Sequence, residues 1–174
     1  LLIEQILNGV QFGVFLFLVS AGLTLVLGIM NVVNLAHGSL FMLGAFYAAT
    51  VFAWTGNFLL ALVVMVPLAL ISGIVIELVV LRTLYNRDHM DQVLATFGLI
   101  LFFNEFVRLV WGAESQPMPM PEFLDGSVEI LPDAPYPIFR LAVIVVGLAV
   151  GLALFILITR TRMGMQIRAG ASNR

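Results

Sequence analysis

Polar side chains recur at three-residue spacing in an otherwise apolar part of this chain, at Asn31, Asn34 and His37. Gly38 and Ser39 follow directly. Amides, an imidazole and a hydroxyl group can donate and accept hydrogen bonds, so they can hold freed backbone groups or a polar solute. Neither a nucleophile with its base nor a cluster of metal ligands accompanies them. The segment is therefore expected either to hold freed backbone groups or to meet a polar solute, and not to break bonds.

The composition indicates which solvent surrounds this polar segment. Of the 174 residues, 61% are hydrophobic and only 10% are charged, whereas about a quarter of the residues in a soluble domain are charged. No Asp, Glu, Lys or Arg occurs between Glu4 and Glu77, and no soluble fold of this size could hide that length of chain from water. We therefore expect a lipid bilayer as the solvent and an all-α architecture.

Several functional classes are excluded by what the sequence lacks. The net charge of −2 and the absence of a basic stripe argue against a nucleic-acid partner. The chain has no cysteine, which excludes disulfides and thiolate metal sites. It also has no lysine and no glycine-rich phosphate loop, which argues against an ATP-binding site in this sequence. We expect no catalytic residue, cofactor or metal ion in this chain.

Apolar stretches of about 20 residues predict the helices that cross the membrane. We place five of them at about 6–28, 39–54, 58–81, 92–111 and 139–159. The chain is thus expected to be a polytopic helical membrane protein. A Pro-rich loop at 112–138 separates the last two spans. This loop is too irregular to cross lipid.

Arginines set the expected orientation, because basic residues accumulate in cytoplasmic loops. Arg82 and Arg87 flank the 82–91 loop, and further arginines follow the last span. The 112–138 loop has five acids and no basic residue. We therefore expect the 82–91 loop and the C-terminal segment in the cytoplasm and the 112–138 loop outside. Counting back places the N-terminus outside, unless the segment after the first span re-enters the membrane.

The segment GIMNVVNLAHGS, residues 28–39, has two competing interpretations. Gly28 and Gly38 have low helix propensity and bracket its polar residues. In the first interpretation it is a polar turn near the headgroups. In the second it is a broken or re-entrant helix whose freed amides and carbonyls line a polar cavity, where irregular backbone is tolerated at membrane depth. The residues alone leave both open.

Other residues indicate how the helices are held together. Glu105 and Arg108 are three apart on the fourth span, which predicts a structural ion pair in the outer part of the membrane. Small residues spaced four apart allow close packing of helices. The candidates are the pairs Gly9 and Gly13, Gly44 and Ala48, and Gly147 and Gly151.

The stretch GLTLVLGIMNVVNLAHGSLFMLGAF closely resembles the N-terminal signature of permease subunits of bacterial branched-chain amino-acid ABC transporters. In that family the pattern G-x-x-x-x-x-N-x-A-H-G follows the first span. Here the pattern is formed by Gly28, Asn34, Ala36, His37 and Gly38. The segment LATFGLILFFNEFVRLVWG is similar to the family's fourth span, and RTRMGMQIRAGASNR is similar to the start of its cytoplasmic coupling segment.

The resemblance implies a single permease domain over 1–174 that is incomplete at its C-terminus. It implies a multi-pass protein of the bacterial inner membrane that translocates branched-chain or related hydrophobic amino acids. The implied partners are a second permease subunit, two ATP-binding subunits and a periplasmic substrate-binding protein. Close relatives of the family carry urea and short amides, which remain an alternative. A non-transporting membrane scaffold is the alternative from another class.

Two sets of residues are expected to carry this function. The hypothesis for the substrate pathway comprises Asn31, Asn34, His37, Gly38 and Ser39. In the cytoplasmic segment 160–174, the resemblance implies contact with an ATP-binding subunit through Gly164, Arg168, Ala169 and Gly170.

Overall fold

The structure of the chain, a computed structural model, describes residues 2–30, 32–114, 116, 118–131, 134–162 and 164–165. Within these ranges five helices are long and apolar enough to cross a membrane. The expected all-α membrane architecture is therefore confirmed. The chain divides into two compact units: unit 1 comprises Leu1–Ile29 with Met120–Arg174, and unit 2 comprises Met30–Pro119.

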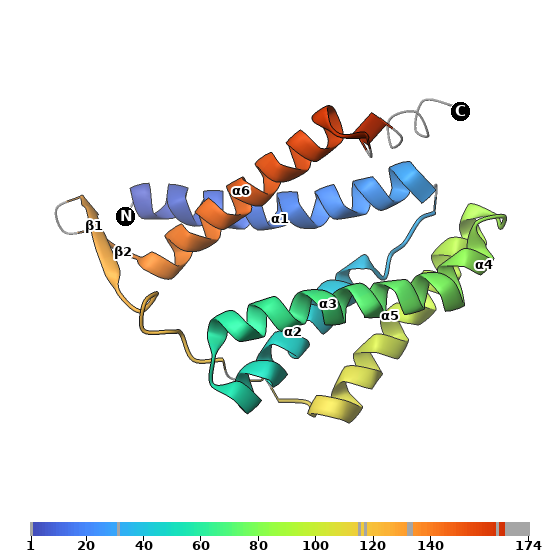
Figure 1. The fold of residues 1–174 in the computed structure, drawn as a ribbon, viewed down its shortest axis with the longest axis horizontal. Coiled ribbons are helices and arrows are strands. Elements are labelled where there is room, and N and C mark those ends of the chain that lie inside the picture. Colours follow the sequence, from blue (N-terminus) through green and yellow to red (C-terminus); the bar gives the residue numbers. More distant parts are fainter. Residues whose placement is uncertain are drawn as a thin grey trace. The chain divides into compact units, whose positions relative to one another are not determined.

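Unit 1 contains two long helices that lie against each other (Figure 1). Helix α1 is Leu2–Met30, of which only the last residue belongs to unit 2, and helix α6 is Ile138–Arg160. Gly147 and Gly151 of α6 face α1. A methyl group added to Gly151 would lie 3.0 Å from Cε1 of Phe17, and one added to Gly147 would overlap Cγ1 of Val14. The two helices therefore approach closely where α6 has no side chains.

A short β-hairpin precedes α6 in unit 1. Strand β1, Ser127–Leu131, pairs antiparallel with strand β2, Ala134–Pro137. Tyr136 on β2 is only 2% exposed, and its hydroxyl group donates to Oδ1 of Asn8 on α1 at 3.2 Å. The hairpin lies in the loop predicted at 112–138. Part of this loop therefore forms regular structure.

Unit 2 is built from three long helices (Figure 1). Helix α2 is His37–Thr55, helix α3 is Phe58–Ile76 and helix α5 is His89–Trp111. The α3 helix continues through a π-helical turn η1, Glu77–Leu81, and a short helix α4, Arg82–Leu84. Helix α2 packs along α3 and also contacts α5.

The connection between α2 and α3 is a compact turn, and two residues within it explain its shape. Gly56 ends α2 with a φ of +64°, a left-handed conformation that glycine adopts without steric cost. Asn57 then caps α3, since its Oδ1 accepts a hydrogen bond from the N–H of Leu60 at 3.0 Å. This turn returns the chain so that α2 and α3 pack antiparallel.

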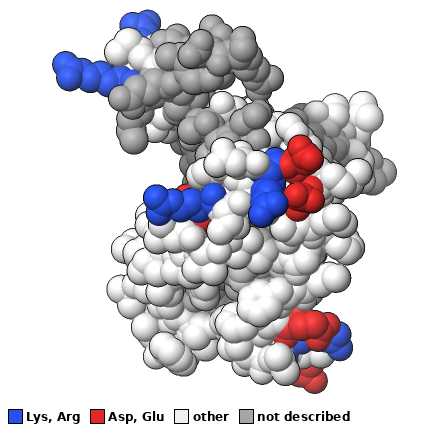
Figure 2. Space-filling view, turned by 90° about the vertical axis from the view of Figure 1, so that its right-hand side faces the viewer, with Lys and Arg blue, Asp and Glu red and all other residues white. Residues whose placement is uncertain are grey.

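Apolar side chains occupy both the interior and the exterior of unit 2. Its core consists of Val32, Leu43, Ile76, Leu81, Leu84, Phe103 and Val107. On the outside, Leu109 is 84% and Val63 is 70% exposed. Figure 2 shows the visible face mostly in white, with charged side chains confined to a few small groups. An exterior of this kind is stable in hydrocarbon and would associate in water.

The second and fifth predicted spans match the helices α2 and α6 closely. The other three predicted spans are shorter than the observed helices at one end or both. The first span was expected at 6–28, and α1 extends it in both directions. The third was expected to end at 81, and the π-helical turn carries the helical chain to Leu84. The fourth begins at His89 rather than at 92. Apolar length predicts the crossing segment, whereas polar residues at its ends can extend a helix beyond the hydrocarbon.

Candidate functional site

The polar segment after the first helix is buried and irregular. Helix α1 ends at Met30 and α2 begins at His37. Residues 32–36, called the break from here on, are irregular chain followed by a turn. Val32 is fully buried, and Asn34 is 2% exposed. Irregular backbone in such surroundings must find hydrogen-bond partners, and helix α5 supplies them.

Gln92, near the start of α5, connects the break to two other segments. Its Oε1 accepts a hydrogen bond from the N–H of Val33 at 3.0 Å. Its Nε2 donates to the carbonyl oxygens of Leu84 and Arg87, each at 3.2 Å. The side chain is 2% exposed. A single buried amide thus holds together the break, the end of α4 and the loop before α5.

Thr96 lies one turn further along α5 and is fully buried. Its Oγ1 is 2.7 Å from the carbonyl oxygen of Gln92 and 3.4 Å from that of Val33. A hydroxyl group has one proton, and the shorter contact within its own helix takes it. Thr96 therefore fills the space beside the break and bonds it more weakly than Gln92 does.

Asn34 builds the turn that starts α2. Its Oδ1 accepts a hydrogen bond from the N–H of Ala36 at 3.0 Å, and its carbonyl oxygen accepts one from the N–H of His37 at 3.4 Å. Asparagine commonly forms this local turn with the residue two positions on. The buried amide oxygen of Asn34 is thus already committed to the backbone.

The other predicted pathway residues differ in how accessible they are. Ser39 is 6% exposed, His37 is half-buried at the first residue of α2, and Gly38 is exposed. Asn31 lies outside the described residues. Within the described part of this segment, a solute could therefore reach His37 and Gly38 more readily than Asn34 or Ser39.

The contribution of α5 to this site was missed by the sequence analysis. Gln92 and Thr96 are polar residues four apart on an apolar helix, which places them on one face. That spacing was a usable signal for a buried polar contact. Nothing local in the sequence indicates that the partner is Val33, which lies 59 residues earlier.

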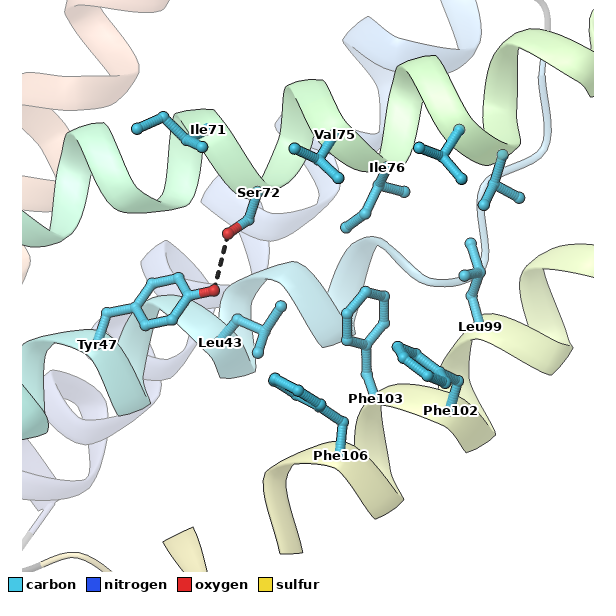
Figure 3. A pocket seen from close by; sticks show the side chains of 12 residues that line it. Leu43, Tyr47, Ile71, Ser72, Val75, Ile76, Leu99, Phe102, Phe103 and Phe106 are labelled. Carbon is cyan, nitrogen blue, oxygen red and sulfur yellow. Dashed lines mark hydrogen bonds between the residues drawn. The ribbon is translucent and has the colours of Figure 1, made fainter. Parts of the chain in front are cut away.

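An apolar cavity of about 510 Å³ lies between α2, α3, η1 and α5 (Figure 3). Most of its wall is aliphatic or aromatic, with Leu43, Phe102 and Phe106 among the lining residues. Tyr47 and Ser72 are the polar pair in its lining, and their hydroxyl groups form a hydrogen bond of 2.7 Å. The cavity suits an apolar chain and has no charged group for a zwitterion.

The predicted pair Glu105 and Arg108 lies near the far end of α5. Nη1 of Arg108 is 3.2 Å from Oε1 of Glu105, and the side chains are 63% and 65% exposed, respectively. Two opposite charges at this distance partly compensate each other. At the same end, Nε1 of Trp111 donates to Oγ1 of Thr50 at 2.7 Å and joins α5 to α2.

A second polar contact lies at the opposite end of unit 2. The hydroxyl group of Tyr85 donates to Oε1 of Glu77, the first residue of η1, at 2.6 Å. Removal from water, and then the hydrogen bond to Glu77 and its negative charge, raise the pKa of Tyr85 to about 12. The phenol therefore remains protonated and continues to donate to the carboxylate of the π-helical turn.

Of the four residues expected to contact an ATP-binding subunit, the structure describes only Gly164. Its N–H donates to Oγ1 of Thr161 at 3.1 Å, and it is buried against the end of α6. A methyl group there would overlap the carbonyl oxygens of Leu157 and Ile158. Glycine is therefore required for the chain to fold back at this point. Arg168, Ala169 and Gly170 lie outside the described residues.

A family model and individual relatives of this chain both point to the same protein family. A family model described as branched-chain amino acid transport system, permease component, matches residues 5–174. The chain is 28% identical over 183 residues to the high-affinity branched-chain amino acid transport system permease protein LivH of Escherichia coli (strain K12). It is 27% identical over 187 residues to LivH of Salmonella typhimurium and 27% identical over 184 residues to the permease protein BraD of Pseudomonas aeruginosa.

These alignments cover 98% of this chain and 59% of each relative. The chain thus spans less than two thirds of the length of the curated relatives it matches. No solved structure matches the chain significantly.

Proposed function

Because the chain belongs to the family described as the permease component of branched-chain amino acid transport systems, we propose that it is a membrane-spanning part of an ABC importer for branched-chain or related hydrophobic amino acids. The observation that carries the proposal is the family match over residues 5–174. The five apolar helices and the buried break between two of them support it.

The proposed assembly contains this protein, a second permease subunit, two ATP-binding subunits and a periplasmic substrate-binding protein, in the bacterial inner membrane. The absence of lysine and of a phosphate loop supports ATP hydrolysis by a partner. The distribution of arginines supports a cytoplasmic 82–91 loop and C-terminal segment, with the 112–138 loop in the periplasm. Gln92 would then hold the break near the cytoplasmic side, since it also binds Leu84 and Arg87.

In this proposal the substrate passes His37 and Gly38, the two accessible residues that directly follow the break. Asn34 and Ser39 are buried and do not meet the substrate in this proposal. An ATP-binding subunit that moves the cytoplasmic loop would also displace the break. The side-chain amide of Gln92 transmits this movement, because it is hydrogen-bonded both to Arg87 in the loop and to Val33 in the break. The proposed pathway is therefore coupled to the cytoplasm by hydrogen bonds rather than by apolar contact alone.

Uptake by the full-length protein, assembled with its partner subunits in lipid vesicles, tests this function. We expect ATP-dependent accumulation of radiolabelled L-leucine, with isoleucine and valine as competitors. Accumulation of urea in place of leucine would contradict the proposed substrate. An intact assembly that hydrolyses ATP but accumulates neither solute would instead indicate a scaffold.

The coupling role proposed for the segment after α6 predicts a large effect of Gly164→Ala. The added methyl group cannot avoid the backbone oxygens of Leu157 and Ile158, so the segment must leave α6 in another direction. We expect substrate-stimulated ATP hydrolysis by the full-length complex to fall by about 2- to 30-fold, the range typical of altered coupling between sites. Gly98→Ala is the matched control, because open space surrounds Gly98 on α5. Equal ATPase rates in the two variants would contradict a docking role for this segment.

A further inference from the structure

Unit 1 contains a hollow of about 430 Å³ with a charged group at one end and an apolar wall at the other. It is lined by Asn8, Gln11, Phe12, Phe15, Arg140 and Val143. The first four residues come from α1, and the last two come from the start of α6. The break does not contribute to its lining.

Arg140 provides the charge, and its contact with the protein is with a neutral group. Its Nη1 donates to Oδ1 of Asn8 at 2.7 Å. The same oxygen accepts a second hydrogen bond, from the hydroxyl group of Tyr136 at 3.2 Å, so both of its lone pairs are used. Among the residues that the structure describes, no carboxylate forms an ion pair with Arg140. None of the described carboxylates compensates the guanidinium group, which has further N–H donors available.

The stability of α6 does not explain this arginine. Arg140 lies in the first turn of α6, where the helix dipole disfavours a positive charge. Arg108, by contrast, has Glu105 beside it on its own helix. Within the described residues, a cation without a carboxylate partner at the unfavourable end of a helix is explained by a ligand that brings the negative charge.

The remaining wall defines what kind of anion fits. Phe12 is 63% and Phe15 is 37% exposed, and Val143 continues the apolar side. Gln11 is half-buried and lines the same hollow. An amino acid of the branched-chain class has a carboxylate for the guanidinium group, an ammonium group for an amide oxygen and an aliphatic side chain for the phenylalanines. An inorganic anion would leave the apolar wall without a partner.

We propose that Arg140, held by Asn8, binds the carboxylate of the amino-acid substrate and that Gln11 binds its ammonium group, at the periplasmic side of unit 1. This inference rests on the proposed function, because the substrate class and the position of the 112–138 loop come from it. Arg140 directly follows that loop, where substrate would arrive from a binding protein. The site recognises the zwitterion before it enters the membrane.

Equilibrium binding to the purified full-length membrane complex, without the binding protein, tests this site. The probes are radiolabelled L-leucine and the competitor L-leucinol, which lacks the carboxylate. Arg140→Gln is expected to weaken leucine binding by about tenfold or more, the worth of a charge-assisted hydrogen bond. Leucinol binding is expected to stay unchanged. Gln11→Ala, a milder change, is expected to weaken leucine binding by a smaller factor and serves if the first variant does not fold.

Arg108→Gln is the matched control, because it removes an arginine that already has a carboxylate partner. The proposal is overturned if Arg140→Gln and Arg108→Gln bind leucine equally, or if Arg140→Gln weakens leucine and leucinol by the same factor. Loss of bound lipid phosphorus in Arg140→Gln, with leucine binding unchanged, would assign Arg140 to a lipid headgroup and also overturn it. Failure of the wild-type complex to accumulate leucine would instead count against the proposed function.

Discussion

Replacing Gln92 by leucine is expected to lower the free energy of unfolding of the full-length protein by about 2–4 kcal/mol and to abolish uptake. Leucine has a similar size but leaves the N–H of Val33 and the carbonyl oxygens of Leu84 and Arg87 without their side-chain partner. The break would then no longer be fixed to α5. Unfolding of the detergent-solubilised protein, followed by circular dichroism, measures the loss.

Two further variants separate hydrogen bonding from the general effect of the substitution. Gln116 is exposed and makes one hydrogen bond, to the carbonyl oxygen of Trp111 at 3.0 Å. Gln116→Leu should therefore change stability by less than about 0.5 kcal/mol. Gln92→Glu keeps the shape but places a carboxylate oxygen opposite two carbonyl oxygens, so it should be destabilising as well. Equal stability of the Gln92→Leu and Gln116→Leu variants would show that the amide does not hold the break.

Replacing Gly147 by alanine is expected to destabilise unit 1 by about 1–3 kcal/mol, as overpacking does in other well-packed interiors. The added methyl group would overlap Cγ1 of Val14 on α1. Valine has one strongly preferred rotamer in a helix, so its side chain cannot turn away. The two helices must separate instead. The same unfolding measurement, applied to the Gly147→Ala protein, reports the cost.

Two further variants test why Gly147→Ala loses stability: a control substitution at another glycine, and a second substitution that removes the overlap. Gly13 lies on α1 in open space, so Gly13→Ala should be neutral or slightly stabilising, since alanine favours the helix. Combining Gly147→Ala with Val14→Ala removes the overlap and should restore most of the stability. If the double variant is no more stable than the single one, the close approach of α6 to α1 at Gly147 is not the cause.

The membrane helices could be predicted because lipid leaves few alternatives for the backbone. Between Glu4 and Glu77 the sequence has no charge, and in hydrocarbon such a stretch must satisfy its own hydrogen bonds as helix. The hairpin of β1 and β2 was not predicted. It depends on contacts such as that of Tyr136 with Asn8, which lie 128 residues apart.

The break illustrates a different limit of sequence reasoning. Asn34 and His37 indicated that the first two spans are separated by a polar segment, and helix α2 does begin at His37. Whether that segment lies on the surface or inside the protein depends on contacts such as that with Gln92, which lies 59 residues further along the chain. Local composition can signal a buried polar group but does not identify its distant partner.

The glycine pairs show the same limit for packing. Three pairs of small residues had the spacing that permits close contact. In the structure, Gly147 and Gly151 meet α1, while a methyl group on Gly9 or Gly13 would meet nothing within 4 Å. The spacing marks a helix face without side chains, and only the arrangement of neighbouring helices decides whether that face is used.

The central claim is that substrate passes His37 and Gly38, directly after the break, and cysteine labelling tests it most directly. Cysteines replace His37, Gly38 and, as the buried reference, Val32 in a cysteine-free full-length complex, and a membrane-impermeant thiol reagent is applied with and without L-leucine. The account predicts labelling at positions 37 and 38 that leucine slows, and none at position 32, which is fully buried in the structure. Labelling that is absent at both 37 and 38, or that leucine does not change, would contradict it.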